Sequence, residues 1–137
     1  MDSLEDPVWL TGDTVSAING QVGAIFGGLI DGVRDETLLS AAIGRPLNKW
    51  HYDDPKPDLL ALAAAYCFAL IKGHPFHDGN KRTAYIAAIV FLELNGQLCA
   101  PKQLDIVRTM NDAAINIIDE DGLTDWFRTN CTENAST

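Results

Sequence analysis

The residues of this chain that could carry out chemistry are concentrated in one short segment, 74–82, which reads HPFHDGNKR. It begins with His74, and a histidine side chain can accept a proton near neutral pH and act as a general base. Four positions later, Asp78 offers a carboxylate beside cationic side chains. A carboxylate next to polyphosphate is a usual ligand of Mg²⁺, because this ion requires hard oxygen ligands. The segment therefore predicts transfer of a phosphoryl or nucleotidyl group.

The second half of the segment has the residue types of a phosphate-binding site. Gly79 allows a tight turn and the close approach of a ligand to the backbone. Asn80, Lys81 and Arg82 then open a helix, whose first N–H groups are free and whose dipole favours anions. Lys81 and Arg82 also supply cationic donors that suit phosphate oxygens. Because the first turn of a helix is unfavourable for a cation, a bound anion best explains both residues.

Two apolar helices are expected on either side of this segment. Residues 58–73 are rich in Ala and Leu, the strongest helix formers, and are apolar on nearly every face, which indicates a buried helix. Residues 81–95 have apolar side chains in helical phase, and Gly73 and Gly96 end the two helices. Polar groups between two core helices are costly unless they lie at the mouth of a pocket. We therefore expect a pocket at this loop.

The remainder of the chain is also expected to be mainly helical. Residues 13–22 place apolar side chains on one helical face, and the glycines that follow predict irregular structure. Asp35 is a good N-cap for a helix over 36–42, which Gly44 and Pro46 are expected to end.

A short strand or flap at Lys49–Tyr52 is the one β element that the sequence suggests, since period-two alternation is nearly absent. After the central helices, a third apolar period runs over 104–118 and a short amphipathic helix over 123–129. These patterns predict a compact all-α domain with a helix–loop–helix at its centre.

Length and composition favour a single domain over 1–137, with a core in about 13–130 and a polar tail over 131–137. Hydrophobic residues make up 47% and charged residues 21%, which excludes disordered and collagen-like classes. Ten Lys and Arg against 19 Asp and Glu give a net charge of −9. Such an acidic surface argues against direct binding of nucleic acid and of anionic membranes.

Targeting signals and cysteines indicate the compartment. The first six residues lack the basic and apolar regions of a secretory signal, and no apolar run is long enough to span a bilayer. Cys67, Cys99 and Cys131 are odd in number and widely spaced, which favours reduced thiols over a disulfide framework or a zinc site. A cytoplasmic protein with no membrane partner is expected.

Segment 74–82 resembles the central motif of the Fic/Doc family, His-x-Phe-x-Asp/Glu-Gly/Ala-Asn-Gly/Lys-Arg, at every fixed position. The similarity extends from Asp35 through Gly96 to the Doc (death-on-curing) branch, for example in LLSAAIGRP at 38–46 and NKRTA at 80–84. The resemblance implies a Fic-like helical bundle.

The resemblance also implies a role for each residue of the motif. His74 would be the base that deprotonates a target hydroxyl, and Asp78 would hold Mg²⁺ or orient His74. Phe76 would anchor the loop in the core. The residues that would contact ATP, in an anion nest and at its phosphates, are Gly79, Asn80, Lys81 and Arg82.

Two further features of the family concern its partners. The flap that docks the target chain as an added strand would correspond to about Pro46–Tyr52. The pattern Thr129-x-x-x-Glu133-Asn134 matches a self-inhibitory motif of some Fic enzymes, in which the glutamate pairs with an arginine where this chain has Tyr85. Inhibition in trans by a cognate antitoxin, as in Doc pairs, is therefore favoured.

Two positions separate the chemistries of the family. Adenylylating Fic enzymes carry Gly where this chain has Lys81 and Arg where it has Tyr85. Doc proteins share the lysine and transfer the γ-phosphate of ATP to a threonine of elongation factor Tu. The resemblance thus implies an ATP- and Mg²⁺-dependent protein Ser/Thr kinase, a toxin of a toxin–antitoxin system that arrests translation. AMP transfer is the alternative within the family.

Proteins of two different classes could also carry these residue types. His51, the dipeptide His77-Asp78 and Asp105 could be the His…His-Asp…Asp ligands of an HD-type metal phosphohydrolase. That interpretation leaves the residues at 80–82 unexplained. A catalytically inactive binding module with the Fic fold is the second possibility.

Overall fold

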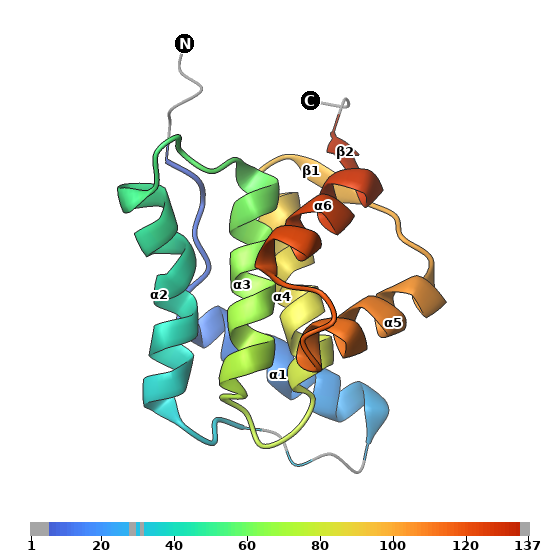
Figure 1. The fold of residues 1–137 in the computed structure, drawn as a ribbon. Coiled ribbons are helices and arrows are strands. Elements are labelled where there is room, and N and C mark those ends of the chain that lie inside the picture. Colours follow the sequence, from blue (N-terminus) through green and yellow to red (C-terminus); the bar gives the residue numbers. More distant parts are fainter. Residues whose placement is uncertain (1–5, 28–29, 31, 135–137) are drawn as a thin grey trace.

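The computed structural model describes residues 6–27, 30 and 32–134, and Figure 1 shows how they are arranged. Over these residues the chain forms helices and one small antiparallel sheet, which confirms the all-α class. The elements are α1 (Gly12–Phe26), α2 (Glu36–Tyr52), α3 (Leu59–Gly73), α4 (Asn80–Leu94), β1 (Gln97–Cys99), α5 (Gln103–Ala114), α6 (Glu120–Asn130) and β2 (Cys131–Glu133).

Helices α3 and α4 form the centre of the molecule, as their apolar sequences predict. α3 packs against α2, α4 and α6, and α1 packs against α4 (Figure 1). Tyr66 on α3 and Phe91 on α4 are fully buried, with ring centroids 5.1 Å apart. Asp58 caps α3, because its side chain accepts a hydrogen bond of 3.0 Å from the N–H of Ala61. The loop that joins α3 to α4 is therefore held at both ends by core helices.

Helix α2 is longer than the sequence predicts, and the predicted flap is wrong. Gly44 and Pro46 are expected to end the helix and 46–52 to form a strand or flap, but α2 is one continuous helix. A proline in a helix interior costs about 3 kcal/mol, because one backbone hydrogen bond is lost. Here packing outweighs that cost. The helix continues beyond the proline because one face of it is buried, and the residues of that face are Leu39, Ala42, Pro46 and Trp50.

Helix α1 also continues past its predicted end. The glycines from Gly20 onward predict irregular structure, yet the helix runs through Gly23 to Phe26, and Gly27 is its C-cap with φ +60°. Its buried face packs against α4 and stabilises the helix despite the glycines. Gly28, in the same predicted irregular stretch, lies outside the described residues, as do positions 1–5 and 135–137.

The third apolar segment, 104–118, forms a shorter helix than its pattern predicts. α5 ends at Ala114, so Ile117 and Ile118 lie in the connection to α6. α6 begins earlier than predicted, because Asp119 caps it by accepting a hydrogen bond of 2.8 Å from the N–H of Gly122.

The small sheet contains a disulfide that the sequence does not predict. β1 pairs antiparallel with β2, which places Cys99 opposite Cys131, and the two side chains are joined by a disulfide. The expectation of three reduced thiols is therefore wrong. The pairing depends on the register of two short strands 32 residues apart, which no local pattern reveals. Cys67 is free and buried, and burial raises the pKa of its thiol.

Both ends of the described chain are attached to the turn that follows α4. The N–H of Val8 donates to Oδ1 of Asn95 over 2.8 Å, and Nδ2 of Asn95 donates to the carbonyl of Val8 over 3.0 Å. The N–H of Asn134 donates to the carbonyl of Gly96 over 2.7 Å. In Figure 1 this turn lies at the top of the molecule, opposite the α3–α4 loop.

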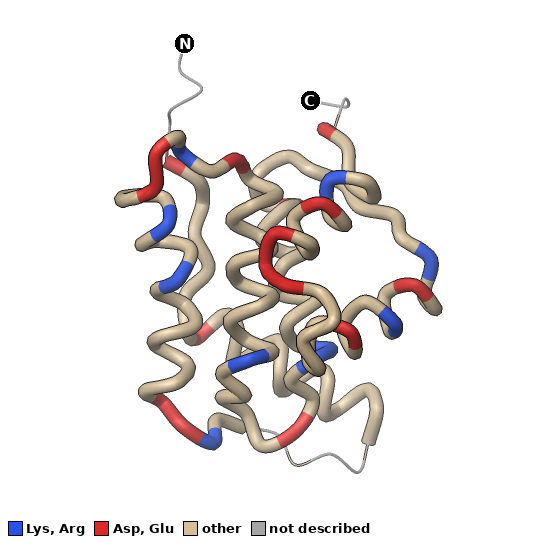
Figure 2. Tube along the Cα trace, in the orientation of Figure 1, with Lys and Arg blue, Asp and Glu red and all other residues tan. Residues whose placement is uncertain are grey.

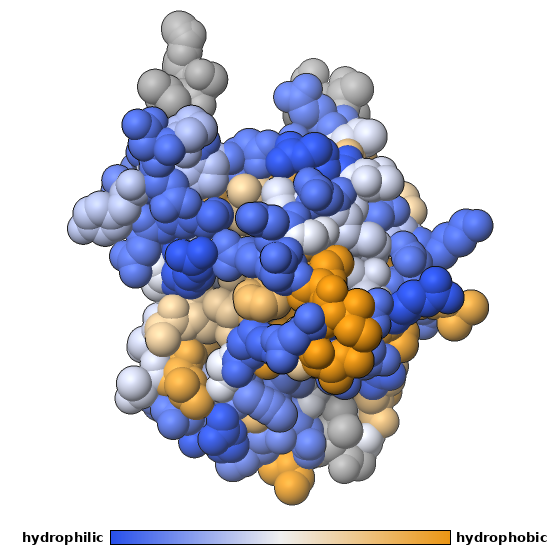
Figure 3. All heavy atoms as spheres, viewed as in Figure 1, coloured by the Kyte–Doolittle hydropathy of each residue, from blue (hydrophilic) through white to orange (hydrophobic). Residues whose placement is uncertain are grey.

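The surface combines an acidic overall charge with local apolar and cationic areas. Figure 2 shows Asp and Glu spread over the trace, with blue segments at the lower ends of α3 and α4. Figure 3 shows an apolar patch near the start of α6, where Ile115 and Ile117 are exposed. Over the described residues, none of the helices combines the length and apolar character needed to cross a bilayer.

Candidate active site

The loop between α3 and α4 begins with His74 in an unusual backbone conformation. Its φ and ψ are 54° and 52°, in the left-handed region that non-glycine residues seldom adopt. The N–H of His74 donates to the carbonyl of Leu70 over 3.2 Å and closes the end of α3. Arg34 donates from Nε to the carbonyl of His74 over 3.1 Å and also from Nη2. The backbone is therefore held while the imidazole stays exposed to the pocket.

Phe76 and Asn80 fix the middle of the loop. Phe76 is 1% exposed, as expected for a core anchor. The amide of Asn80 bonds to both backbone groups of Phe76: Oδ1 accepts from its N–H and Nδ2 donates to its carbonyl, each over 3.0 Å. Nδ2 of Asn80 also lies 3.4 Å from Nδ1 of His74. The side chain of Asn80 thus sets the shape of the loop that presents His74.

The segment that precedes α2 supports the other side of the loop. The N–H groups of Arg34 and Asp35 donate to the carbonyl of Pro75 over 2.7 and 3.1 Å. The N–H of His77 donates to the carbonyl of Gly32 over 3.1 Å, and Val33 forms a β-bridge with Phe76. Residues 32–35 therefore lie along this side of the loop, joined to it by three backbone hydrogen bonds and one β-bridge.

Asn19 is a site residue that sequence reasoning missed. It is 1% exposed on α1, and its Nδ2 donates to the carbonyl of Asp78 over 2.9 Å and to Oγ1 of Thr83 over 3.2 Å. Its Oδ1 accepts from the N–H of Gly32 over 2.9 Å. A polar residue on the apolar face of the predicted helix 13–22 was the signal that could have found it.

Asp78 lies at the pocket with one carboxylate oxygen engaged. Oδ2 accepts a hydrogen bond of 2.9 Å from the N–H of Ile30. Among the described residues, no cluster of three or more His, Cys, Asp or Glu side chains could hold a metal ion. A lone carboxylate fits Mg²⁺, which usually binds one or two protein carboxylates and completes its coordination with water and substrate phosphates. The residues present therefore suit a magnesium ion that arrives with a nucleotide.

The N-terminus of α4 has no side-chain cap. Gly79 occupies the N-cap with φ 75°, a conformation that favours glycine, and it provides no side-chain cap. The first N–H groups of α4 therefore lack the usual capping oxygen and carry the positive end of the helix dipole. Lys81 and Arg82 follow in the first turn, where their charges do not favour the helix itself.

The cationic side chains at the pocket already have neighbours. Nζ of Lys81 donates to Oδ1 of Asn111 on α5 over 2.9 Å. The guanidinium of Arg82 lies 3.7 Å from the ring centroid of Phe26, at the end of α1. Nζ of Lys72 donates to the carbonyl of Ala114 over 3.2 Å.

One cavity of about 1020 Å³ joins the predicted site residues. It is lined by all six of them: His74, Asp78, Gly79, Asn80, Lys81 and Arg82. Its opposite wall comes from α5 and includes Ile106, Val107 and Met110. The cavity thus has a polar side at the loop and an apolar side, which suits a ligand with a phosphate group and a flat apolar part.

Tyr85 also lines the cavity and packs edge-on against Trp126, with ring centroids 6.2 Å apart. Burial raises the pKa of Tyr85 to about 12, so the phenol stays neutral at physiological pH. It can donate one hydrogen bond but supplies no charge to a phosphate.

The residues considered as HD-type metal ligands do not form a cluster at the pocket, and the pattern at 129–134 lies away from it. His51 lies in the last turn of α2, and Asp105 accepts a hydrogen bond of 2.9 Å from Nε1 of Trp126. Because the described residues form no metal-binding cluster, they contain no HD-type centre. Glu133 pairs with Gln97 in the small sheet, at the end of the molecule opposite the loop (Figure 1).

Comparison with known proteins agrees with the geometry. The sequence model described as the Fic/DOC family matches residues 9–92, more than half of the chain and the whole of the loop. The chain belongs to the Fic/DOC family. Its match with "Toxin Doc" of Mycolicibacterium smegmatis (strain ATCC 700084 / mc(2)155) is 42% identical over 100 residues, 72% of this chain and 76% of that protein.

A second member of the Fic/DOC family is also similar. "Protein kinase doc" of Escherichia phage P1 is 41% identical over 71 residues, which cover 52% of this chain and 55% of the phage protein. The alignment with the phage protein thus spans about half of either chain. Both relatives carry the Doc name, in agreement with the branch that the motif predicts.

Proposed function

We propose that this protein is a Doc-type toxin that phosphorylates a Ser or Thr hydroxyl of a translation factor with ATP and Mg²⁺. The observation that carries the proposal is the convergence of His74, Asp78 and the N-terminus of α4 on one cavity. The name of the phage P1 relative, a protein kinase, supports the same chemistry.

In the proposed reaction, His74 takes the proton from the target hydroxyl. The hydroxyl oxygen then bonds to the γ-phosphorus as the bond from this phosphorus to the β–γ bridging oxygen breaks, and ADP leaves. The N–H groups at the start of α4, with Lys81 and Arg82, stabilise the charge on the phosphate oxygens. Asp78 would hold Mg²⁺, which neutralises phosphate charge when bound.

Two contacts favour γ-phosphate transfer over AMP transfer. Lys81 extends from the first turn of α4 to Asn111 and so occupies space that a glycine would leave open. Tyr85 is packed against Trp126 where adenylylating relatives place a second arginine. A site with this lysine and without that arginine supports a nucleotide orientation in which the terminal phosphate faces His74.

The partners and compartment follow from the same proposal. The resemblance to Doc toxins suggests elongation factor Tu as the target and a cognate antitoxin as an inhibitor in trans. Both the target and ATP are cytoplasmic, so we propose that the toxin acts there and arrests translation. Neither nucleic acid nor a membrane is required by this chemistry.

Labelled nucleotides test the proposal directly. The wild-type protein and His74→Ala are incubated with elongation factor Tu, Mg²⁺ and ATP labelled at the γ or the α position. We expect γ label on the target, a mass increase of about 80 Da, and a loss of at least about 100-fold in rate with His74→Ala. An increase of about 329 Da with α label would instead establish AMP transfer.

A growth assay separates an enzyme from an inactive binding module. Expression of wild-type protein should arrest growth and expression of His74→Ala should not. Arrest by both variants at equal protein levels would favour a module that acts by binding alone.

A further inference from the structure

Helix α5 presents one face to the cavity, and that face includes the polar residue Asn111. The lining residues of α5 are Gln103, Ile106, Val107, Met110, Asn111 and Ala114. They recur three and four positions apart, so they form one stripe along the helix. Asn111 is exposed and lies on this stripe beside Met110, so its amide can reach a group at the cavity.

The side chain of Asn111 binds Lys81. Nζ of Lys81, in the first turn of α4, donates to Oδ1 of Asn111 over 2.9 Å. An ammonium group has three donors, and this bond uses one of them. Two donors remain for phosphate oxygens, so Lys81 can keep Asn111 as a partner when a ligand binds.

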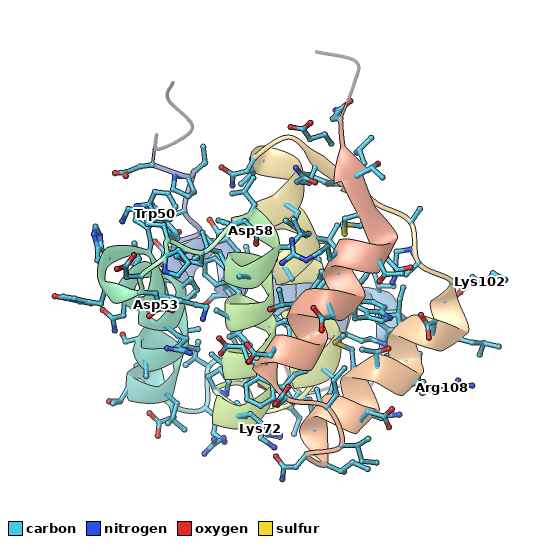
Figure 4. All side chains as sticks on the ribbon, turned by 45° about the horizontal axis from the view of Figure 1, so that its top comes forward. Trp50, Asp53, Asp58, Lys72, Lys102 and Arg108 are labelled. Carbon is cyan, nitrogen blue, oxygen red and sulfur yellow. A yellow bond between two sulfur atoms is a disulfide. The ribbon has the colours of Figure 1, made fainter. Side chains whose placement is uncertain are left out.

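Helix α5 is a fixed support for this bond. At its C-terminus, Nζ of Lys72 donates to the carbonyl of Ala114 and to Oδ1 of Asn116. Near its N-terminus, Asp105 accepts from Trp126. In its middle, Met110 is 3% exposed. Figure 4 shows Lys72 at the end of α3, beside the connection between α5 and α6.

We propose that Asn111 is a positioning residue that holds the ammonium group of Lys81 toward bound triphosphate. This inference rests on the ATP site of the proposed function and adds a residue from outside the 74–82 motif. A lysine side chain has four flexible methylene groups and loses much freedom when it binds a phosphate. Asn111 removes part of that freedom before the ligand arrives, so binding costs less.

A binding experiment with a double-mutant cycle tests the inference. The ligand is inorganic triphosphate with Mg²⁺, and its Kd is measured by calorimetry for wild type, Asn111→Ala, Lys81→Ala and the double variant. We expect Asn111→Ala to raise the Kd about 3- to 10-fold, which is the worth of one hydrogen bond. In the Lys81→Ala background the same change should leave the Kd unaltered, because the two residues act through one contact.

Two further variants exclude a merely structural effect. Asn111→Gln keeps an amide oxygen and should restore part of the affinity. Arg108→Ala alters an exposed residue of α5 that does not line the cavity and points away from the bundle (Figure 4). It should bind triphosphate like the wild type.

The outcomes distinguish this inference from the proposed function. The role of Asn111 would be overturned if Asn111→Ala had the same Kd as the wild type or a lower one. It would also be overturned if Asn111→Ala raised the Kd equally in the Lys81→Ala background. Neither result would bear on the proposed kinase activity. Triphosphate binding that shows the expected cycle without any γ-phosphate transfer to protein would overturn the kinase and support the role of Asn111. No triphosphate binding by the wild type would overturn both.

Discussion

Asn80 has a structural part in the site that its place in the motif does not reveal. The resemblance implies a contact with the anion, whereas in the structure both polar atoms of its amide bond to the backbone of Phe76. Asn80 is 7% exposed, so these bonds form largely away from water. At the residue scale, Asn80 therefore supports the backbone of the loop that presents His74, and its Nδ2 also lies 3.4 Å from Nδ1 of the His74 ring.

Replacement of Asn80 tests this dependence. Asn80→Ala removes both bonds and leaves the N–H and carbonyl of Phe76 without these partners, so we expect a loss of roughly 2 to 4 kcal/mol in the free energy of unfolding. Asn80→Asp keeps the acceptor and should lose less. Urea unfolding of the three proteins measures the difference. Equal midpoints for wild type and Asn80→Ala would show that the amide does not support the loop.

The elements that the sequence predicts well are those with strong local patterns. α3 and α4 are apolar on nearly every face, and Asp35 is the side-chain cap of α2 as expected. The predicted stop of α2 at Pro46 is wrong because it applies a local rule for proline to a residue whose packing overrides that rule. The parts of the site from Asn19 and Asn111 were missed for another reason. Asn19 on α1 contacts Asp78 of the loop, and Asn111 on α5 contacts Lys81 in the first turn of α4. These partners are far apart in the sequence, so no local pattern predicts the contacts.

Alanine substitution of one glycine in α2 and one in α6 tests how these helices are packed. At Gly44 in α2 a Cβ would meet nothing within 4 Å, so Gly44→Ala should stabilise the protein by about 0.5 to 1 kcal/mol. At Gly122 in α6 it would lie 2.5 Å from Cγ1 of Ile118, so Gly122→Ala should be destabilising. Thermal unfolding should show a Tm raised by a few degrees in the first variant and lowered in the second. A lower Tm for Gly44→Ala would mean that α2 is not the continuous helix described.

The carboxyl group of Asp58, at the start of α3, should make the thermal stability of the protein depend on pH in the acid range. Burial alone would raise the pKa of Asp58, but hydrogen bonds from Arg128 and from the N–H of Ala61 outweigh it and hold this pKa below its usual value. A carboxyl with a lowered folded pKa stabilises the fold above its unfolded pKa, and this stability is lost as pH falls through the folded value.

Asp58→Asn keeps a capping side chain and removes the titration. As the pH falls from about 5 to about 3, we therefore expect the Tm of the wild type to fall further than that of Asp58→Asn. Because Asp58 and Arg128 are both about half exposed, the difference should be small and should shrink in high salt. Parallel Tm curves for the two proteins at low salt would contradict it.

At the scale of the whole molecule, the disulfide encloses the elements that complete the cavity. Cys99 and Cys131 are 32 residues apart, and the chain between them contains α5 and α6. A cross-link of this loop length stabilises a protein by roughly 3 to 4 kcal/mol through its effect on the unfolded chain.

Loss of the cross-link should therefore lower the Tm by an amount on the order of 10 °C. The comparison is wild type with and without reductant, beside the double variant Cys99→Ala/Cys131→Ala. Reductant should lower the Tm of the wild type and leave that of the double variant unchanged. An effect of equal size in both would point to Cys67 or to the reagent itself.

Both ends of the described chain lie on the side of the molecule away from the cavity, and Val8 and Asn134 bond there to the neighbouring residues Asn95 and Gly96. A flexible linker from position 134 to position 6 would close the backbone into a ring, and the exposed connection at 53–56 could then be opened to give new ends. Such a circular permutant would retain α3, the loop and α4 as one uninterrupted piece. The architecture thus offers a route to fuse a reporter beside α2 without altering the cavity.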